Sequence, residues 1–281
     1  MSLSTPAIWI DGERANALPL PDRGLDFGDG LFETLLVVRG IPLFADLHLE
    51  RLALGARRLG FPQDALAGVH SCLAPALAAV GEAWDCAALR LTLTRGSAPR
   101  GYAPPELAIP RVIASASPLD LPSAELPRPL DVGLCDIRYS VQPLLAGIKH
   151  LNRLEQVMAA AEARTQGLDE VVMLDLNDQV RSLSAANIFM LESATLVTPP
   201  LRDCGILGTR RRLLVERWSV ELGIAVLEQD FSLARLLAAD EVFCTSSLRG
   251  VQPVGRIGAR RWSEFPLCSA IHARYVRELP C

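Results

Sequence analysis

The sequence predicts a mixed α/β protein with two domains. Short runs of apolar and β-branched residues alternate with longer segments of helical periodicity, a pattern that favours sheets covered by helices. A polar, proline-rich stretch, LDLPSAELPRP, begins at residue 119 and is the best linker candidate in the chain. With 281 residues, of which 50% are hydrophobic, the chain can bury one large or two medium cores. We therefore expect a smaller N-terminal α/β domain over residues 1–121 and a larger C-terminal domain over residues 122–281.

The composition argues against several classes of protein. The net charge of −4 gives no basic excess, so nucleic acid is not expected as the main partner. No apolar run approaches the roughly 20 residues that span a bilayer, and no signal peptide is evident, so we expect a cytoplasmic protein without membrane contact. The seven cysteines show no CxxC or Cys/His spacing, which favours reduced thiols over disulfides or a metal site.

The N-terminal elements follow in order. Residues 7–11 predict a short strand before a tight turn. Residues 21–30 contain three glycines, which allow backbone conformations closed to other residues, and they are followed by a strand over residues 31–38 that enters a hairpin. An ordinary glycine-rich loop before a hairpin would show the same pattern. Those glycines are Gly24, Gly28 and Gly30.

Two helices and two strands complete the first domain. Residues 44–59 predict a helix on which His48 and Arg51 are surface neighbours, and a solvated face is the plain interpretation of Arg51. A second amphipathic helix is expected at about 63–81. After a strand at 89–94, a Gly/Pro loop carries Arg95, Arg100 and Tyr102, and the next strand lies within ELAIPRVIASASP. The two arginines either hold an anionic substrate through bidentate contacts or are plain surface charge.

The second domain opens with a strand, LDVGLCDIRYS, and continues into LLAGIKHLNRLEQVM. Lys149 lies in a mostly apolar approach to a predicted helix. It is either a helix-entry lysine whose ammonium reaches water or a partly desolvated amine with a lowered pKa that can form a Schiff base. The helix is predicted from the spacing of Leu151, Leu154, Val157 and Met158.

Two later segments could bind one anion. Residues 169–200 suggest three strands, with turns at Asn177-Asp178 and Glu192-Ser193. A glycine loop beginning at residue 204 precedes a helix, whose first N–H groups can bind a phosphate, although many loop-to-helix joins look alike. The strand in 241–254 runs into a turn whose hydroxyls could donate to the same anion, namely those of Thr245, Ser246 and Ser247.

The order and spacing of these motifs resemble the fold-type IV pyridoxal-phosphate enzymes over almost the whole chain. This family includes the branched-chain and D-amino-acid aminotransferases and 4-amino-4-deoxychorismate lyase. KHLNRLEQ and RGSAPRGY resemble the lyase branch more than the aminotransferases. The motifs are DRGLDFGDGLFET, HLERL, TRGSAPRGY, AGIKHLNRLEQ, SAANIF, TPPLRDCGILGTRR and ADEVFCTSSLRGVQPV.

The resemblance implies pyridoxal 5'-phosphate bound to Lys149 as a Schiff base. It implies a D-amino-acid aminotransferase-like fold with the cofactor in the cleft between two domains, and a homodimer in which the partner chain borders each site. It also implies which residues bind the cofactor phosphate, namely Arg51, the backbone amides near Ile206 and Leu207, and the turn at Thr245 and Ser246.

One position departs from the family pattern. The alignment of SAANIF puts Ser182 where these enzymes usually have a glutamate facing the pyridine nitrogen of the cofactor. A carboxylate keeps that nitrogen protonated and strengthens the cofactor as an electron sink, whereas a serine hydroxyl need not. Asp178 could take the place of that glutamate only if the alignment shifted by four residues. Transamination should suffer more than an elimination whose product becomes aromatic.

We therefore expect a lyase that converts 4-amino-4-deoxychorismate to 4-aminobenzoate and pyruvate, with Lys149 as the base. Arg95 and Arg100 are the candidates for the substrate carboxylates. Two alternatives are a D-amino-acid or branched-chain aminotransferase and, because of Ser182, a weakly active cofactor-binding protein. Other polar residues of the motifs are expected to shape the structure, namely Glu33, Asn152, Arg153 and Glu155.

Overall fold

The computed structural model describes residues 7–280, and their contacts divide them into two compact units. The first unit comprises the described parts of Met1–Leu121 and Leu279–Cys281, together with Ile148–Asn152. The second comprises Pro122–Gly147 and Arg153–Glu278. The segment around Lys149, which the sequence analysis assigned to the second domain, thus groups with the first unit, because its backbone is hydrogen-bonded to a strand there.

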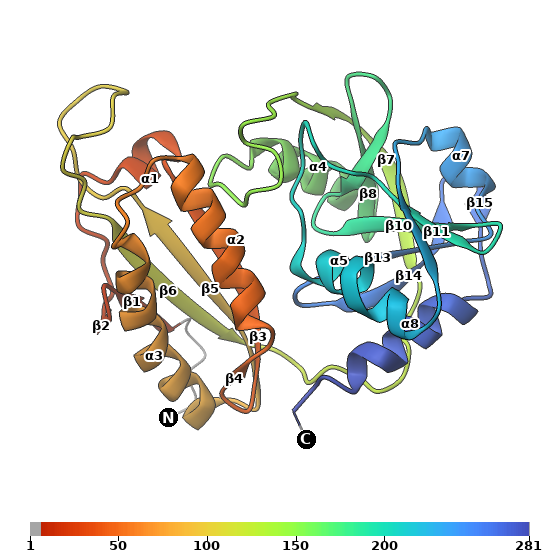
Figure 1. Cartoon of the computed structure of the whole chain (residues 1–281), viewed down its shortest axis with the longest axis horizontal. Helices are drawn as coiled ribbons and strands as arrows, with labels where there is room; N and C mark the ends of the chain where they lie inside the picture. Colours follow the sequence, from red (N-terminus) through yellow and green to blue (C-terminus); the bar gives the residue numbers. More distant parts are fainter. Residues whose placement is uncertain (1–6, 281) are drawn as a thin grey trace. The chain divides into compact units, whose positions relative to one another are not determined.

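The first unit contains a six-stranded antiparallel sheet with the order β2-β1-β6-β5-β3-β4 (Figure 1). Its strands are β1 (Ala7–Ile10), β2 (Glu13–Arg14), β3 (Gly30–Val38), β4 (Ile41–Pro42), β5 (Cys86–Thr94) and β6 (Arg111–Pro118). Its helices are α1 (Arg23–Phe27), α2 (Ala45–Arg58) and α3 (Ala65–Ala83).

Strand β3 is buried along nearly its whole length because α2 and α3 both pack against it. Helix α2 approaches closely at Gly55, where an added Cβ would lie 2.7 Å from the Leu31 side chain. Within the described residues, α3 is the one helix long and apolar enough to cross a membrane by length and composition. Its buried side chains, including Val69 and Val80, belong to the core of this unit, where the helix contacts β1, β3, β5 and β6.

The second unit contains a mixed sheet in which nine strands are described, with the order β12-β11-β10-β13-β14-β7-β8-β9 and β15 paired to β14. The pairs β11–β12, β14–β7 and β7–β8 are parallel. The strands are β7 (Leu130–Tyr139), β8 (Glu170–Asp175), β9 (Val180–Leu183), β10 (Asn187–Glu192), β11 (Thr195–Thr198), β12 (Ala225–Glu228), β13 (Glu241–Ser246), β14 (Gly250–Ile257) and β15 (Arg260–Arg261).

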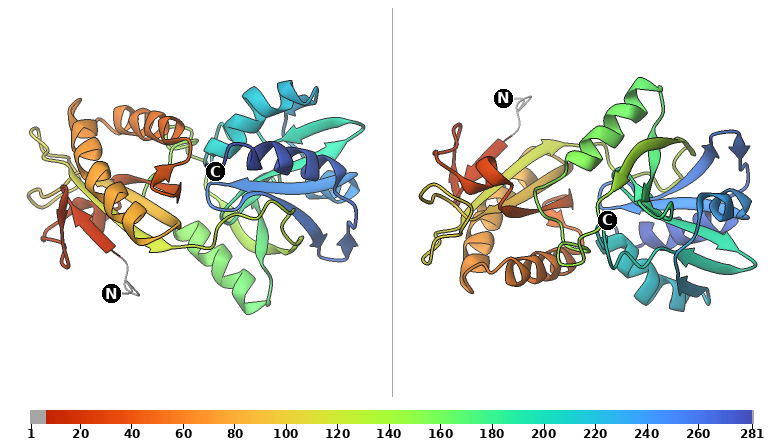
Figure 2. Two further views of the ribbon diagram at one scale, coloured as in Figure 1. Left: turned by 90° about the horizontal axis from the view of Figure 1, so that it is seen from below. Right: turned by 90° about the horizontal axis from the view of Figure 1, so that it is seen from above.

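The helices of the second unit cover this sheet. Helix α4 packs on β7 and β8, and α8 lies along β14 (Figure 2). A helical stretch after the glycine loop changes its hydrogen-bond pattern twice, from α5 through the π-helix η1 to α6. The bounds are α4 (Leu154–Thr165), α5 (Thr209–Leu213), η1 (Leu214–Trp218), α6 (Ser219–Glu221), α7 (Leu233–Ala238) and α8 (Pro266–Val276).

Two expectations from the sequence need correction. Residues 169–200 form four strands instead of three, because the chain turns between β9 and β10, where the Leu183 N–H donates to the Ala186 carbonyl. Helix α4 buries Ala159 and Ala163 against the sheet instead of its larger apolar residues. Their small side chains allow a close approach, and the predicted apolar stripe is exposed, with Leu154, Val157 and Met158 at 76%, 60% and 53%.

The described cysteines are all buried and unpaired, namely Cys72, Cys86, Cys135, Cys204, Cys244 and Cys268. Burial raises the pKa of several of these thiols, that of Cys135 to about 11. They therefore behave as small core residues. Cys281 lies outside the described residues.

Candidate active site

Lys149 is the only lysine in the sequence, and its position is fixed by backbone pairing to β3. The Phe32 N–H donates to the Lys149 carbonyl at 2.8 Å, and the Leu151 N–H donates to the Gly30 carbonyl at 3.0 Å. The Lys149 Nζ lies 4.3 Å from the centroid of the Phe32 ring, in cation–π contact with it. The ammonium is thus held half-buried at an aromatic face.

Two glycines of the DFGDG motif make this close approach possible. A Cβ at Gly30 would lie 2.5 Å from the Leu93 carbonyl oxygen and 2.7 Å from Leu151. Gly28 has φ +64°, and a Cβ there would lie 2.6 Å from the Asn152 side chain. Asn152 instead donates from Nδ2 to the Gly28 carbonyl at 3.1 Å and fastens the segment after Lys149. Asn152 therefore shapes the site.

Arg51 and Glu33 form a nearly buried ion pair in the same unit. Arg51 donates from Nε to Glu33 Oε1 at 2.8 Å and from a terminal nitrogen to Oε2 at 2.6 Å. His48 Nδ1 lies 2.6 Å from the same Oε2 and is fully buried. Burial alone would raise the pKa of Glu33, but the charge of Arg51 and the hydrogen bonds from His48 and Arg51 lower that pKa to about 2. Glu33 is thus a carboxylate that orients the Arg51 guanidinium.

In the second unit, the glycine loop is held by the Asn187 side chain. Asn187 Nδ2 donates to the Ile206 carbonyl at 2.9 Å, and its Oδ1 accepts from the Gly208 N–H at 3.0 Å. A Cβ at Gly208 would lie 2.1 Å from that Oδ1, so a side chain there would displace the Asn187 side chain from the loop. Asn187 lies within the SAANIF motif, yet the sequence analysis did not single it out.

The helix after this loop begins directly after Gly208, as the sequence predicts. Its first residue is Thr209, so the N–H groups of its first turn belong to Thr209 and the following residues. The Leu207 N–H, implied as a phosphate donor, donates to the Gly147 carbonyl at 3.2 Å. The Thr209 hydroxyl lies 3.4 Å from that of Ser247. Thr209 is a candidate that the sequence analysis missed.

Thr245 carries an unsatisfied polar group in the second unit. It is 1% exposed, and its Oγ1 has no hydrogen-bond partner among the residues that the structure describes. A buried hydroxyl without a partner is unfavourable by about 1–3 kcal/mol, so a ligand that offers this hydroxyl a hydrogen bond would be stabilised here. The neighbouring Ser246 Oγ already accepts from the Arg249 N–H at 3.2 Å.

Ser182 lies in β9 with its hydroxyl fully engaged. Its Oγ donates to the Leu183 carbonyl at 2.7 Å and lies 2.9 Å from the Tyr139 hydroxyl. Because a serine has one hydroxyl hydrogen, Ser182 must accept from Tyr139. Burial raises the pKa of Tyr139, so this donor stays protonated. Asp178 lies in the exposed turn between β8 and β9, beside Arg138.

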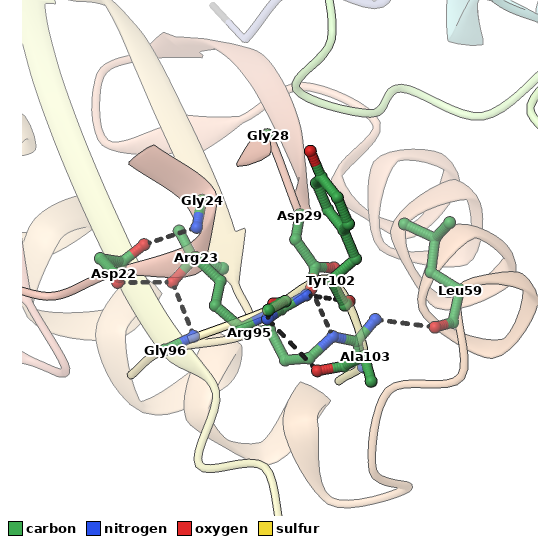
Figure 3. Close-up of polar contacts among 12 residues, drawn as sticks. Asp22, Arg23, Gly24, Gly28, Asp29, Leu59, Arg95, Gly96, Tyr102 and Ala103 are labelled. Atoms are coloured by element: carbon green, nitrogen blue, oxygen red, sulfur yellow. Dashed lines mark hydrogen bonds and ion pairs between the residues drawn. The ribbon is translucent and has the colours of Figure 1, made fainter. Parts of the chain in front are cut away.

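The two loop arginines have different surroundings. Arg95 is buried, and its guanidinium donates to Asp29 and to the carbonyls of Leu59 and Gly60 (Figure 3). Because its guanidinium already donates to these acceptors, Arg95 anchors the base of the loop instead of binding a substrate carboxylate as expected. Arg100 is exposed and makes no ion pair or hydrogen bond within the described part of the chain.

Comparison with known proteins places this chain in a family. A model of the class IV amino-transferases matches residues 30–257, and the chain therefore belongs to the class IV aminotransferase family. The mixed α/β fold predicted from the sequence is confirmed.

Within this family, the similarity extends to individual enzymes. The solved structure of a 4-amino-4-deoxychorismate lyase from Pseudomonas aeruginosa is 40% identical, with a TM-score of 0.88 over 97% of this chain and 99% of that chain. An aminodeoxychorismate lyase of Vibrio harveyi is 34% identical over 265 residues, 92% of this chain and 94% of that protein. A D-alanine aminotransferase of Bacillus licheniformis is 28% identical over 242 residues, 86% of this chain and 83% of that protein.

Proposed function

We propose that the protein is a pyridoxal-phosphate-dependent lyase that converts 4-amino-4-deoxychorismate to 4-aminobenzoate and pyruvate. The observation that carries this proposal is the placement of the only lysine, Lys149, within AGIKHLNRLEQ and against β3. The similarity to two aminodeoxychorismate lyases over almost their full length supports the lyase reaction over transamination.

The residues present fit the cofactor. Lys149 supplies the amine for the covalent link, and Arg51 supplies a cation for the phosphate. The buried Thr245 hydroxyl has no hydrogen-bond partner among the described residues, and it supplies a donor for the phosphate. We propose that Ser246, Ile206, Leu207 and the helix start at Thr209 complete the phosphate ligands, with Leu207 exchanging its long bond to Gly147. A phosphate at a helix N-terminus is favoured by both the N–H groups and the helix dipole.

When bound, pyridoxal phosphate draws electrons from the carbon that bears the substrate nitrogen. With the cofactor and substrate bound, Lys149 would serve as a neutral base whose Nζ accepts the proton of that ring carbon. The ether bond to the enolpyruvyl group then breaks, and the ring becomes aromatic. The departing enolpyruvate takes up a proton to become pyruvate, so the reaction needs no oxidant or reductant.

Ser182 favours elimination over transamination. Its hydroxyl hydrogen is donated to the Leu183 carbonyl, so the side chain offers neither a carboxylate nor a second hydrogen to a ring nitrogen. We propose that this weak electron sink is sufficient for the lyase because aromatisation of the product drives the reaction. Arg100, whose charge has no partner in the described part of the chain, is our candidate for a substrate carboxylate.

We also propose that the protein is a cytoplasmic homodimer. Leu154, Val157 and Met158 lie at i, i+3 and i+4 on α4 and are all more than half exposed. Three large apolar side chains on one face of a helix mark a surface that another molecule covers. Light scattering of the pure protein and of a Val157→Glu variant tests whether this face holds two copies together.

Reduction with borohydride tests the central assignment. In the protein incubated with pyridoxal phosphate, reduction should fix one cofactor to the tryptic peptide that contains Lys149, and the Lys149→Ala variant should take up none there. Because the sequence has no other lysine, the only competing amine is the N-terminus. Absence of cofactor on this peptide would overturn the assignment.

The reaction itself is tested by assaying 4-aminobenzoate and pyruvate. The lyase should form both in equal amounts from 4-amino-4-deoxychorismate. Amino-group transfer from D-alanine to an oxo acid, without turnover of aminodeoxychorismate, would identify an aminotransferase instead. Cofactor attachment without either activity would identify a weakly active cofactor-binding homologue.

A further inference from the structure

The loop between β5 and β6, residues 95–110, is long, has no regular secondary structure and is nevertheless held at its middle by a buried side chain. Arg23 of α1 donates to three successive carbonyls of this loop, those of Gly101, Tyr102 and Ala103, at 2.9, 2.7 and 3.4 Å (Figure 3). Arg23 itself is only 4% exposed. Loops of this length are uncommon in compact domains and are usually either functional or disordered, and this one has an ordered backbone.

The contacts of Arg23 with the three loop carbonyls, here called the clamp, are built around one shared carboxylate. Arg23 and Arg95 each donate from Nε to the same oxygen of Asp29, both at 2.8 Å. Burial alone would raise the pKa of Asp29, but the hydrogen bonds from Arg95 and Arg23 lower it. Two buried guanidinium groups thus face one carboxylate, and the remaining positive charge is balanced by backbone carbonyl dipoles. Arg23 therefore stabilises the loop only when those three carbonyls point toward it.

Aromatic contacts close the same cluster. The Arg23 guanidinium lies 4.9 Å from the centroid of the Phe27 ring, and Phe27 lies 5.4 Å from the Tyr102 ring. Tyr102 is nevertheless 86% exposed. The apolar side chains of Leu107 and Ile109, later in the same loop, are exposed to 90% and 82%. The loop backbone is thus fixed from inside while its side chains face outward, an arrangement suited to presenting them to a ligand.

We propose that Arg23 is a positioning residue for substrate recognition. By binding the carbonyls of Gly101–Ala103, it fixes the backbone next to Arg100, so that the Arg100 guanidinium is held ready for a carboxylate of the substrate. This inference rests on the proposed lyase function, whose substrate carries two carboxylates. Pre-organising the loop removes the entropy loss of ordering it on binding.

Trypsin provides a test that is independent of activity. The bond between Arg100 and Gly101 is a cleavage site, and cleavage requires the residues on both sides to leave their folded conformation. Replacing Arg23 by Met should raise the rate of cleavage there at least about 10-fold, since two or more charge-assisted hydrogen bonds are lost. Arg235→Met, which removes a bidentate ion pair with Glu192 in the second unit, is the matched control and should leave this rate unchanged.

Kinetics then test the link to Arg100. In Arg23→Met, KM for aminodeoxychorismate should rise about 10-fold with kcat nearly unchanged, as expected when uniform binding is lost. Arg100→Met should raise KM similarly, and the double variant should match Arg100→Met alone, because residues that act together are not additive. Arg23→Lys keeps the charge without the planar fork and should lie between wild type and Arg23→Met.

Three outcomes would overturn the proposal: an unchanged trypsin rate in Arg23→Met, an unchanged KM, or effects of the two substitutions that multiply. If Arg23→Met does not fold, the same measurements on Arg23→Lys decide, with wild-type values overturning the proposal. A wild-type protein that carries the cofactor but turns over no aminodeoxychorismate would refute the lyase function, whereas the trypsin result would still report on the clamp.

Discussion

The carboxylate of Glu33 accepts a hydrogen bond from Arg51 at each of its two oxygens, at 2.8 and 2.6 Å, so the guanidinium is held along one edge. His48 binds the carboxylate from another side and is itself fully buried. The pair comes from β3 and α2, which approach each other closely at Gly55. The orientation of Arg51 is therefore set before any ligand binds.

Removing the charge of Glu33 should weaken cofactor binding through the phosphate. Glu33→Gln removes the carboxylate that orients Arg51 and should raise the Kd for pyridoxal phosphate about 10-fold, the loss of one charge-assisted contact. Titrations with pyridoxal, which lacks the phosphate, should show no such change. Glu82→Gln, at an exposed position of α3, is the control. Equal weakening for both ligands would contradict the role of Arg51.

The same carboxylate should make stability depend on pH in the acid range. The folded-state pKa of Glu33 is lowered from 4.5 to about 2, so its contribution is complete above pH 4.5 and is lost as the pH falls toward 2. The shift corresponds to roughly 3 kcal/mol. Urea unfolding of wild type and Glu33→Gln from pH 6 to pH 2.5 measures this. The two curves should converge on acidification, and a constant difference would contradict the assignment.

Thr245→Val should have opposite effects with and without the cofactor. Without it, the substitution removes a buried hydroxyl that has no partner among the described residues, so the melting temperature should stay equal or rise. With pyridoxal phosphate, the variant should gain less stability than wild type because one phosphate donor is missing. Thermal melts of both proteins with and without the cofactor measure the two effects. A lower melting temperature without cofactor would show that the hydroxyl is already satisfied.

Ser182 and Tyr139 should be energetically coupled. Ser182→Ala leaves the buried Tyr139 hydroxyl without this acceptor and should lower the free energy of unfolding by about 1–3 kcal/mol. Adding Tyr139→Phe should recover part of that loss, because it removes the stranded donor. A double-mutant cycle by urea denaturation measures the coupling. Additive effects would mean that the two hydroxyls do not depend on each other.

Gly30→Ala should displace the lysine segment. The added methyl group would meet the Leu93 carbonyl at 2.5 Å and Leu151 at 2.7 Å, so the pairing of Lys149 with β3 must shift. We expect lower stability and slower attachment of the cofactor on borohydride reduction. Gly68→Ala in α3, where the nearest atom is 3.5 Å away, is the matched control and should stabilise by up to about 1 kcal/mol. Equal behaviour of the two variants would rule out a packing role for Gly30.

Elements with strong periodicity or clear turn residues could be predicted from the sequence, and those without could not. Strand β3 and helices α2 and α3 follow directly from apolar spacing. The turn between β9 and β10 contains no glycine or proline, so the sequence offers no sign that residues 169–200 form four strands. The helix after the glycine loop was expected directly after Gly208, and it begins at Thr209. The contact between Asn187 and Gly208 that holds this loop could not be predicted, because the two residues lie 21 positions apart in the sequence.

Site residues could be predicted where a motif identifies them, but their partners come from distant parts of the chain. Arg95 donates to the carbonyls of Leu59 and Gly60 as well as to Asp29, and no local pattern links these positions. The same limit applies to α4. Its stripe of Leu154, Val157 and Met158 has the spacing of a buried face, yet the alanines on its other side lie against the sheet. Helical periodicity identifies an apolar face without revealing what covers it.

The solitary lysine makes occupancy of the site readable by peptide chemistry. A protease specific for lysine can cut the unfolded chain only after Lys149, into two fragments. A reduced cofactor bond on that side chain would block the cut, so the intact fraction on a gel would equal the fraction of chains that carried the cofactor. Amine-reactive reagents would likewise report whether this side chain is covered, because the chain offers them no other ε-amine.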